Sequence, residues 1–87
     1  MAIEGVYREL GARIQRARRH AKITQKSLGA AIGHTRLSVS AIENARQRVQ
    51  IHTLYRIAAL LGVTVEQLLP STDMPIAVDG ERNADVR

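Results

Sequence analysis

Two threonines and a glycine, closely spaced in the first half of the chain, most constrain how it can fold. Thr24 and Thr35 each precede a run with helical apolar spacing, and threonine accepts hydrogen bonds from the free amides at a helix start. Gly33 lies between them, and glycine readily takes the left-handed conformation that ends helices. The pattern predicts one short helix over Gln25–Ile32 and a second from Arg36 to about residue 43, joined by a turn of about three residues.

Apolar residues at spacings of three and four continue on both sides of this pair. They predict a longer helix from about Ile3 to Ala21, a fourth helix that ends at Gly62, and a short fifth one closed by Pro70. The fifth helix has a capping box, because Thr64 is followed three residues later by Gln67.

The composition agrees with a small helical domain. The chain has 87 residues, no Phe or Trp and only two Tyr, so its core consists of Ala, Leu, Ile and Val. Such a core favours a helical bundle over a sheet sandwich. We therefore predict an all-α fold: a compact five-helix bundle with a helix-turn-helix over residues 1–69, followed by a short C-terminal tail over residues 70–87.

The charge is divided unevenly between these two parts. Residues 1–69 hold eleven of the thirteen Arg and Lys and four of the eight acids, a net charge of +7, whereas residues 70–87 carry −2. A domain this cationic fits a polyanionic partner, which is either nucleic acid or an anionic membrane surface. The first helix has the apolar stripe and the many arginines of a helix that lies on an anionic membrane surface. The other helices need that stripe to form the core, which favours nucleic acid as the partner.

Several classes of protein are disfavoured by what the sequence lacks. It has no cysteine, no apolar run near the ~20 residues that span a bilayer and no signal pattern, so we expect a cytoplasmic protein with no membrane contact. No Asp precedes Asp73, and the glycines form no phosphate-binding loop. His20, His34 and His52 lack metal-ligand spacing. We expect no enzyme, no metal and no cofactor.

The segment TQKSLGAAIGHTRLSVSAIEN, residues 24–44, resembles the lambda-repressor-like, Cro-type (Xre) helix-turn-helix family. The resemblance extends from LGARIQRAR at residues 10–18 to LYRIAALLGVTVEQLL at residues 54–69, about three quarters of the chain. It implies a sequence-specific transcriptional regulator, most often a repressor, that binds a palindromic operator as a homodimer through the major groove of double-stranded DNA.

The resemblance also implies which residues contact DNA. Gln25 reaches the duplex from the start of the first helix of the motif, and the second helix presents residues to base edges and phosphates. Two arginines in the following loop contact the backbone or the minor groove. The full set is Gln25, Thr35, Arg36, Leu37, Ser38, Ser40, Ala41, Arg46 and Arg48. In this loop Ala45 stands where the family often has Gly, and Val49 where Pro is common.

A structural salt bridge is expected between Arg18 and Glu43. At about 100° per residue, Glu43 falls on the apolar side of its helix with Val39 and Ile42, and Arg18 lies on the apolar margin of the first helix. An unpaired charge at either place is costly. In the resembling family, an Arg and a Glu at these positions pair.

Partners beyond DNA remain open at this point. The dimer surface is either the C-terminal end of the bundle (Tyr55, Leu60, Val65 and Leu69) or a strand from Met74 to Val78. Two alternatives use the same bundle: an antitoxin that autoregulates its operon and binds a protein partner through the tail, and a restriction-modification controller protein.

Overall fold

The computed structural model describes residues 2–71, and the strand considered for residues 74–78 lies outside this range. Within it the chain forms five α-helices, which confirms the predicted all-α fold. Their bounds are α1 (Ile3–His20), α2 (Gln25–Ile32), α3 (Arg36–Glu43), α4 (Ile51–Leu61) and α5 (Val65–Leu68). Among them, none is long and apolar enough to cross a membrane.

The helix boundaries follow from local chemistry. The Thr24 hydroxyl accepts a hydrogen bond from the Ser27 backbone at 3.0 Å, and the Thr35 hydroxyl accepts one from Ser38 at the same distance. Each bond satisfies one of the free amides at the start of α2 or α3. The turn between these helices begins at Gly33, whose φ of 73° is the left-handed conformation expected there. The predicted capping box of α5 is also present.

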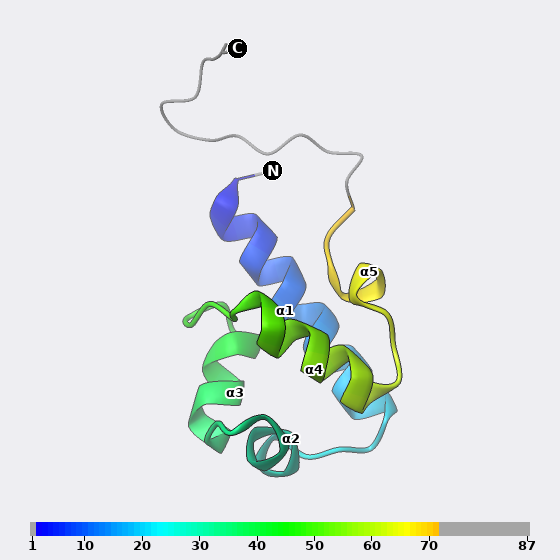
Figure 1. Cartoon of the computed structure of the whole chain (residues 1–87). Coiled ribbons are helices and arrows are strands. Elements are labelled where there is room, and N and C mark those ends of the chain that lie inside the picture. The colour runs from blue at the N-terminus through cyan, green and yellow to red at the C-terminus, as the bar shows by residue number, and fades with distance from the viewer. Residues whose placement is uncertain (1, 72–87) are drawn as a thin grey trace.

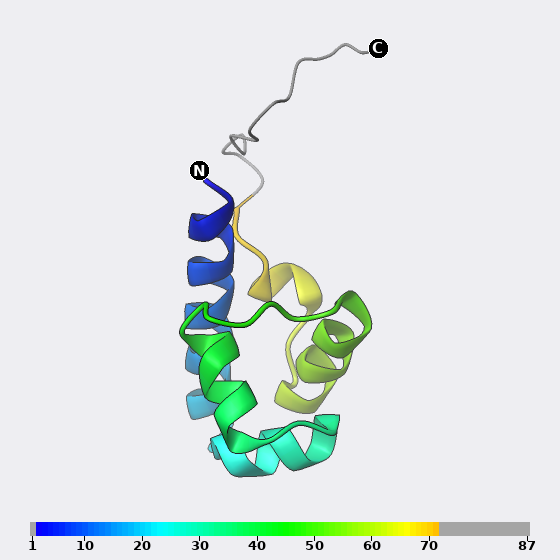
Figure 2. The same cartoon turned by 90° about the vertical axis from the view of Figure 1, so that its left-hand side faces the viewer.

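The five helices enclose one apolar core. In Figure 2, α1 runs along one side of the molecule with α3 beside it, α2 closes the lower end, and α4 lies on the opposite side. Figure 1 shows α4 and α3 from the adjacent direction, and α5 next to the end of the described chain. The buried apolar residues are Leu10, Ile14, Leu28, Ile32, Val39, Ile42, Leu54, Ile57, Ala58, Leu61 and Leu68.

Two arginines bind backbone carbonyls of distant elements. Arg13 of α1 donates to the carbonyl oxygen of Leu69 at 2.9 Å, which holds the end of α5 against α1. Arg56 of α4 donates to the carbonyl of Ala31 at 2.8 Å, near the end of α2. Arg13 also bonds Glu9 at 2.8 Å, and this hydrogen bond lowers the pKa of the Glu9 carboxyl. The two carbonyl contacts thus tie α5 to α1 and α4 to the end of α2.

Candidate nucleic-acid interface

The helix α3 has two different faces. Val39, Ile42 and Glu43 are buried in the bundle, as the periodicity predicts. On the other side Arg36 is exposed and Leu37 is 69% exposed, while Ser40 and Ala41 are partly buried. A leucine that stays this exposed gains little from folding, because most of its apolar surface remains in water. This face is therefore available for a partner.

The expected salt bridge between Arg18 and Glu43 is present inside the bundle. The Arg18 Nε lies 2.6 Å from Glu43 Oε2, and Arg18 donates to Oε1 at 3.2 Å through its Nη2, so the pair is bidentate. The side chain of Glu43 is completely buried and that of Arg18 is 9% exposed. Arg18 also donates to the carbonyl of Ile23 at 2.9 Å. The pair thus joins α3 to the end of α1 and to the segment before α2.

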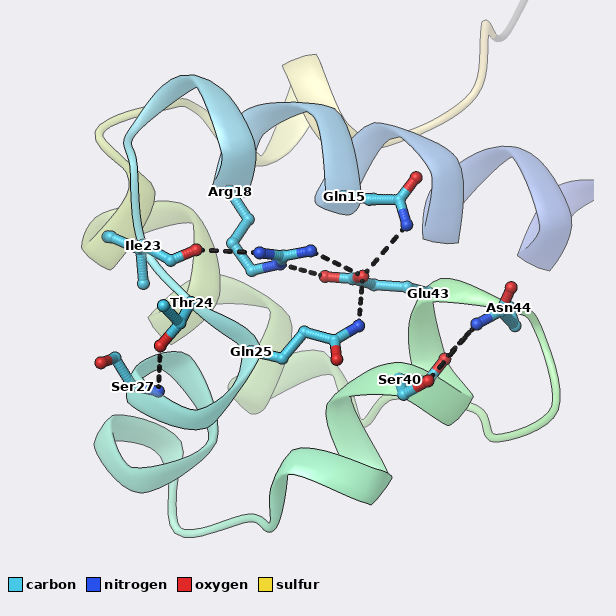
Figure 3. A network of polar contacts seen from close by, with 9 residues as sticks. All are labelled: Gln15, Arg18, Ile23, Thr24, Gln25, Ser27, Ser40, Glu43 and Asn44. Carbon is cyan, nitrogen blue, oxygen red and sulfur yellow. Dashed lines mark hydrogen bonds and ion pairs between the residues drawn. The ribbon is translucent and has the colours of Figure 1, made fainter.

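Two glutamine amides complete the environment of the buried carboxylate. Figure 3 shows Gln15 and Arg18 of α1 and Gln25 of α2 converging on Glu43 of α3. Gln25 donates to Glu43 Oε1 at 3.0 Å, and Gln15 donates to the same oxygen at 3.4 Å. The sequence predicts Gln25 only as a DNA contact and gives no role to Gln15. Together with the Nε and Nη2 groups of Arg18, the two amides give the carboxylate four donors. These bonds orient α3 relative to α1 and α2.

Glycines permit the close approach of helices at two points. A Cβ atom on Gly29 would lie 2.9 Å from the carbonyl oxygen of His34, so α2 can lie this close to the turn only with glycine there. A Cβ on Gly11 would lie 2.5 Å from the carbonyl oxygens of both Ile42 and Glu43. Sequence reasoning missed Gly11, because a glycine inside a helix carries no local signal of what packs against it. It places the backbone of α1 directly on the end of α3.

The loop after α3 returns toward the exposed face of that helix. Ala45 has φ of 61°, and the Arg46 amide donates to the carbonyl of Ala41 at 2.8 Å. Arg46 and Arg48 are both exposed, and the Arg48 guanidinium lies 4.7 Å from the centre of the Tyr7 ring on α1. This cation–π contact fixes the second arginine of the loop beside the bundle. The predicted backbone-contacting arginines therefore lie on a loop that is tied to both α3 and α1.

A cationic cleft of about 420 Å³ lies where the end of α1 and the starts of α2 and α3 meet. It is lined by Arg18, Arg19, Thr24, Gln25, Lys26 and Arg36. The structure thus brings Gln25 and Arg36 together and adds two cations, Arg19 and Lys26, which the sequence reading did not assign to DNA. Their proximity depends on how α1 packs against α2, which spacing along the chain does not reveal. Such a concentration of positive charge attracts phosphate groups.

Comparison with known proteins identifies a family. The helix-turn-helix family model matches residues 14–68, more than half of the chain. A curated relative, the uncharacterized HTH-type transcriptional regulator y4dJ of Sinorhizobium fredii, is 33% identical over 64 residues, which cover 74% of this chain and 83% of that protein. The residues matched by the family model include the buried pair, the turn and the exposed face of α3.

Solved structures share the same arrangement of helices. The hypothetical transcription factor NHTF from Neisseria is 30% identical with a TM-score of 0.67, covering 80% of this chain and 82% of that one. Hydroxypropylphosphonic acid epoxidase from S. wedmorenis is 26% identical with a TM-score of 0.70, covering 75% of this chain. The chain spans only 35% of the length of that epoxidase. It belongs to the lambda-repressor-like helix-turn-helix family of DNA-binding transcriptional regulators.

Proposed function

We propose that this chain is a repressor that binds a near-palindromic operator as a homodimer, with α3 in the major groove. The observation that carries the proposal is the division of α3 into a buried face held by Glu43 and an exposed face led by Arg36 and Leu37. An α-helix fits the major groove of B-DNA, where base edges can be distinguished. Bound at an operator, the protein would prevent access to the promoter.

Residues at the start of α3 would read the bases. The exposed Arg36 guanidinium can donate two hydrogen bonds to O6 and N7 of one guanine. Leu37 and Ala41 present apolar surface that suits the methyl groups of thymine, and Ser40 lies beside them. Because Leu37 is 69% exposed in the free protein, covering it on DNA would add apolar burial that folding does not supply.

The surrounding residues would hold the backbone. Thr35 and Ser38 lie at the first turn of α3, and Arg46 and Arg48 lie on the exposed loop behind it. Gln25 uses one amide N–H for Glu43, so the second N–H remains to donate to a phosphate. Contacts of this kind fix the orientation of the protein and carry no direct sequence information.

The homodimer would form at the end of the bundle away from the turn. Tyr55 is 62% exposed, Leu60 is 44% exposed and Leu69 is 37% exposed, and a groove of about 390 Å³ runs between α4 and α5. Val65, also expected on this surface, is partly buried and packs against the core. A second copy would cover this apolar surface and place two α3 helices on half-sites about 34–36 Å apart.

Selection of bound DNA from a random duplex pool tests the proposal. We expect a sequence with two inverted half-sites, bound by a species of twice the monomer mass in sedimentation velocity. A guanine should occur at one fixed position in each half-site. Failure to enrich any sequence, or a single asymmetric site bound by a monomer, would contradict it. Transcription from a promoter that carries the selected site should fall when the protein is added.

A further inference from the structure

Gln47, in the loop after α3, lies back against that helix. Its backbone N–H donates to the carbonyl of Ala41 at 3.2 Å, and its side-chain Nε2 donates to the Ser38 hydroxyl at 2.8 Å. Both acceptors belong to α3 and are three residues apart. Gln47 is exposed, so this side chain is held in place by hydrogen bonds and not by packing. Sequence reasoning gave it no role.

The hydrogen bond to Ser38 determines what this pair offers to a partner. Because the Ser38 oxygen accepts from Gln47, its own hydroxyl hydrogen is left to donate. Within residues 2–71 no acceptor receives that hydrogen, nor the second N–H of the Gln47 amide. Accepting one bond polarises a hydroxyl and strengthens it as a donor. Ser38 and Gln47 therefore present two neutral donors side by side.

The position of the pair indicates its ligand. Ser38 follows Leu37, which is in the middle of the exposed face, and its short side chain projects to the side of that face next to the loop that carries Gln47. When a helix lies in the major groove, its centre faces base edges and its sides face the sugar-phosphate backbone. We infer that Ser38 and Gln47 together donate to one phosphate of the DNA backbone. This rests on the proposed placement of α3.

A neutral phosphate contact has a distinct thermodynamic signature. An arginine that binds a phosphate releases condensed counterions, so its removal flattens the dependence of affinity on salt. Ser38 and Gln47 carry no charge, so removal of the amide should weaken binding equally at every salt concentration. If Gln47 contacted a base instead, its removal would change the sequence preference. If its removal only loosened the loop, Arg46 or Arg48 would lose its phosphate contact and the salt slope would become flatter.

Gln47→Ala is the first test, with Gln50→Ala as its matched control. Gln50 is an exposed glutamine of the same loop whose side chain makes no capping bond to α4. We expect Gln47→Ala to raise Kd about tenfold on every sequence, with unchanged salt slope, base preference and melting temperature. Gln50→Ala should bind as the unsubstituted chain does. An unchanged Kd, a flatter salt slope or an altered base preference for Gln47→Ala would overturn the inference.

Uncharged methylphosphonate at single backbone positions locates the contact. One substitution should weaken the unsubstituted chain about tenfold and should weaken Gln47→Ala by a smaller factor, because only the Ser38 donor is left in that variant. Additive losses at every position would overturn the phosphate contact. Gln47→Glu should bind worse than Gln47→Ala, because a carboxylate repels the phosphate. If the unsubstituted chain did not bind duplex DNA, the proposed function would fail. If the unsubstituted chain and Gln47→Ala bound DNA equally well, only the phosphate contact of Ser38 and Gln47 would be overturned.

Discussion

The two faces of α3, a helix of only eight residues, differ in their surroundings. The inward face is crowded: Glu43 accepts four hydrogen-bond donors, and the backbone of α1 lies against its carbonyl oxygen. The outward face is open, and Leu37 on it is mostly exposed. Positioning and recognition are therefore carried by different residues of one helix. Substitutions on the outward face can change the DNA sequence that is bound without changing the fold.

The largest expected effect of a single substitution lies on the inward face. Glu43→Ala leaves the buried Arg18 guanidinium without its carboxylate, and an uncompensated buried charge costs about 3–5 kcal/mol of unfolding free energy. Urea denaturation measures this loss. Glu9→Ala removes an exposed carboxylate that also binds an arginine, and it should change stability much less. Equal effects of the two substitutions would show that the buried pair does not hold α3.

The second prediction concerns the close contact between α1 and α3. Gly11→Ala places a methyl group 2.5 Å from the carbonyl oxygens of Ile42 and Glu43, so one of the two helices must move. Overpacking of this kind costs about 1–3 kcal/mol. Because the shift occurs at the end of α3, DNA affinity should fall together with stability. Denaturation and gel-shift measurements on the same variant test this, and a stable variant with normal affinity would contradict it.

The contrast between Gly11 and the threonine caps explains how far the sequence predicts this fold. Thr24, Thr35 and Gly33 act on amides and dihedral angles within four residues, so their effect can be inferred from local pattern alone. Gly11 meets the end of α3, more than thirty residues away in the chain. Nothing near Gly11 in the sequence distinguishes it from a glycine that merely weakens a helix.

The candidate interface shows the same limit. Periodicity separates the buried Val39 from the exposed Leu37, and the family resemblance supplies the pairing of Arg18 with Glu43. The bonds from Gln15 to Glu43 and from Gln47 to Ser38 depend on side-chain directions in the folded bundle. Side-chain hydrogen bonds between helices produce no periodic pattern in the sequence, so they can be identified only in the folded structure.

The third prediction removes the principal base contact from the outward face. Arg36→Ala should cost about 1–3 kcal/mol of binding free energy and relax preference at one base position, with stability unchanged because Arg36 is exposed. Repeating the duplex selection with this variant measures both effects. If base preferences stayed the same, the assignment of α3 as the reading helix would be wrong.

A smaller effect is expected at the loop that joins the two faces. Arg48→Ala should weaken all sequences alike and reduce the salt slope by about 0.9, the share of one phosphate. It also removes the cation–π contact with Tyr7, which costs about 0.5–1 kcal/mol of stability at an exposed site. Titrations at several salt concentrations separate these effects. A slope that did not change would place Arg48 in a structural role only.

The smallest effect concerns the backbone where α3 ends. Ala45 has φ of 61°, close to the 73° of Gly33. In alanine this left-handed conformation causes steric strain that glycine avoids. Ala45→Gly should therefore stabilise the protein by about 0.5–1 kcal/mol, a rise of roughly 2–8 °C in melting temperature. Lys22→Gly, at φ of 60° after α1, is the matched control.

The two glycine variants should differ in their effect on DNA. Both relieve strain, but only residue 45 precedes Arg46 and Gln47, whose amides bond to Ala41. A glycine at 45 widens the range of loop conformations, so the loop residues would lose part of their fixed orientation. We expect Ala45→Gly to gain stability while binding DNA slightly less tightly, and Lys22→Gly to gain stability with unchanged affinity. Identical affinities for both would mean that recognition depends on α3 alone.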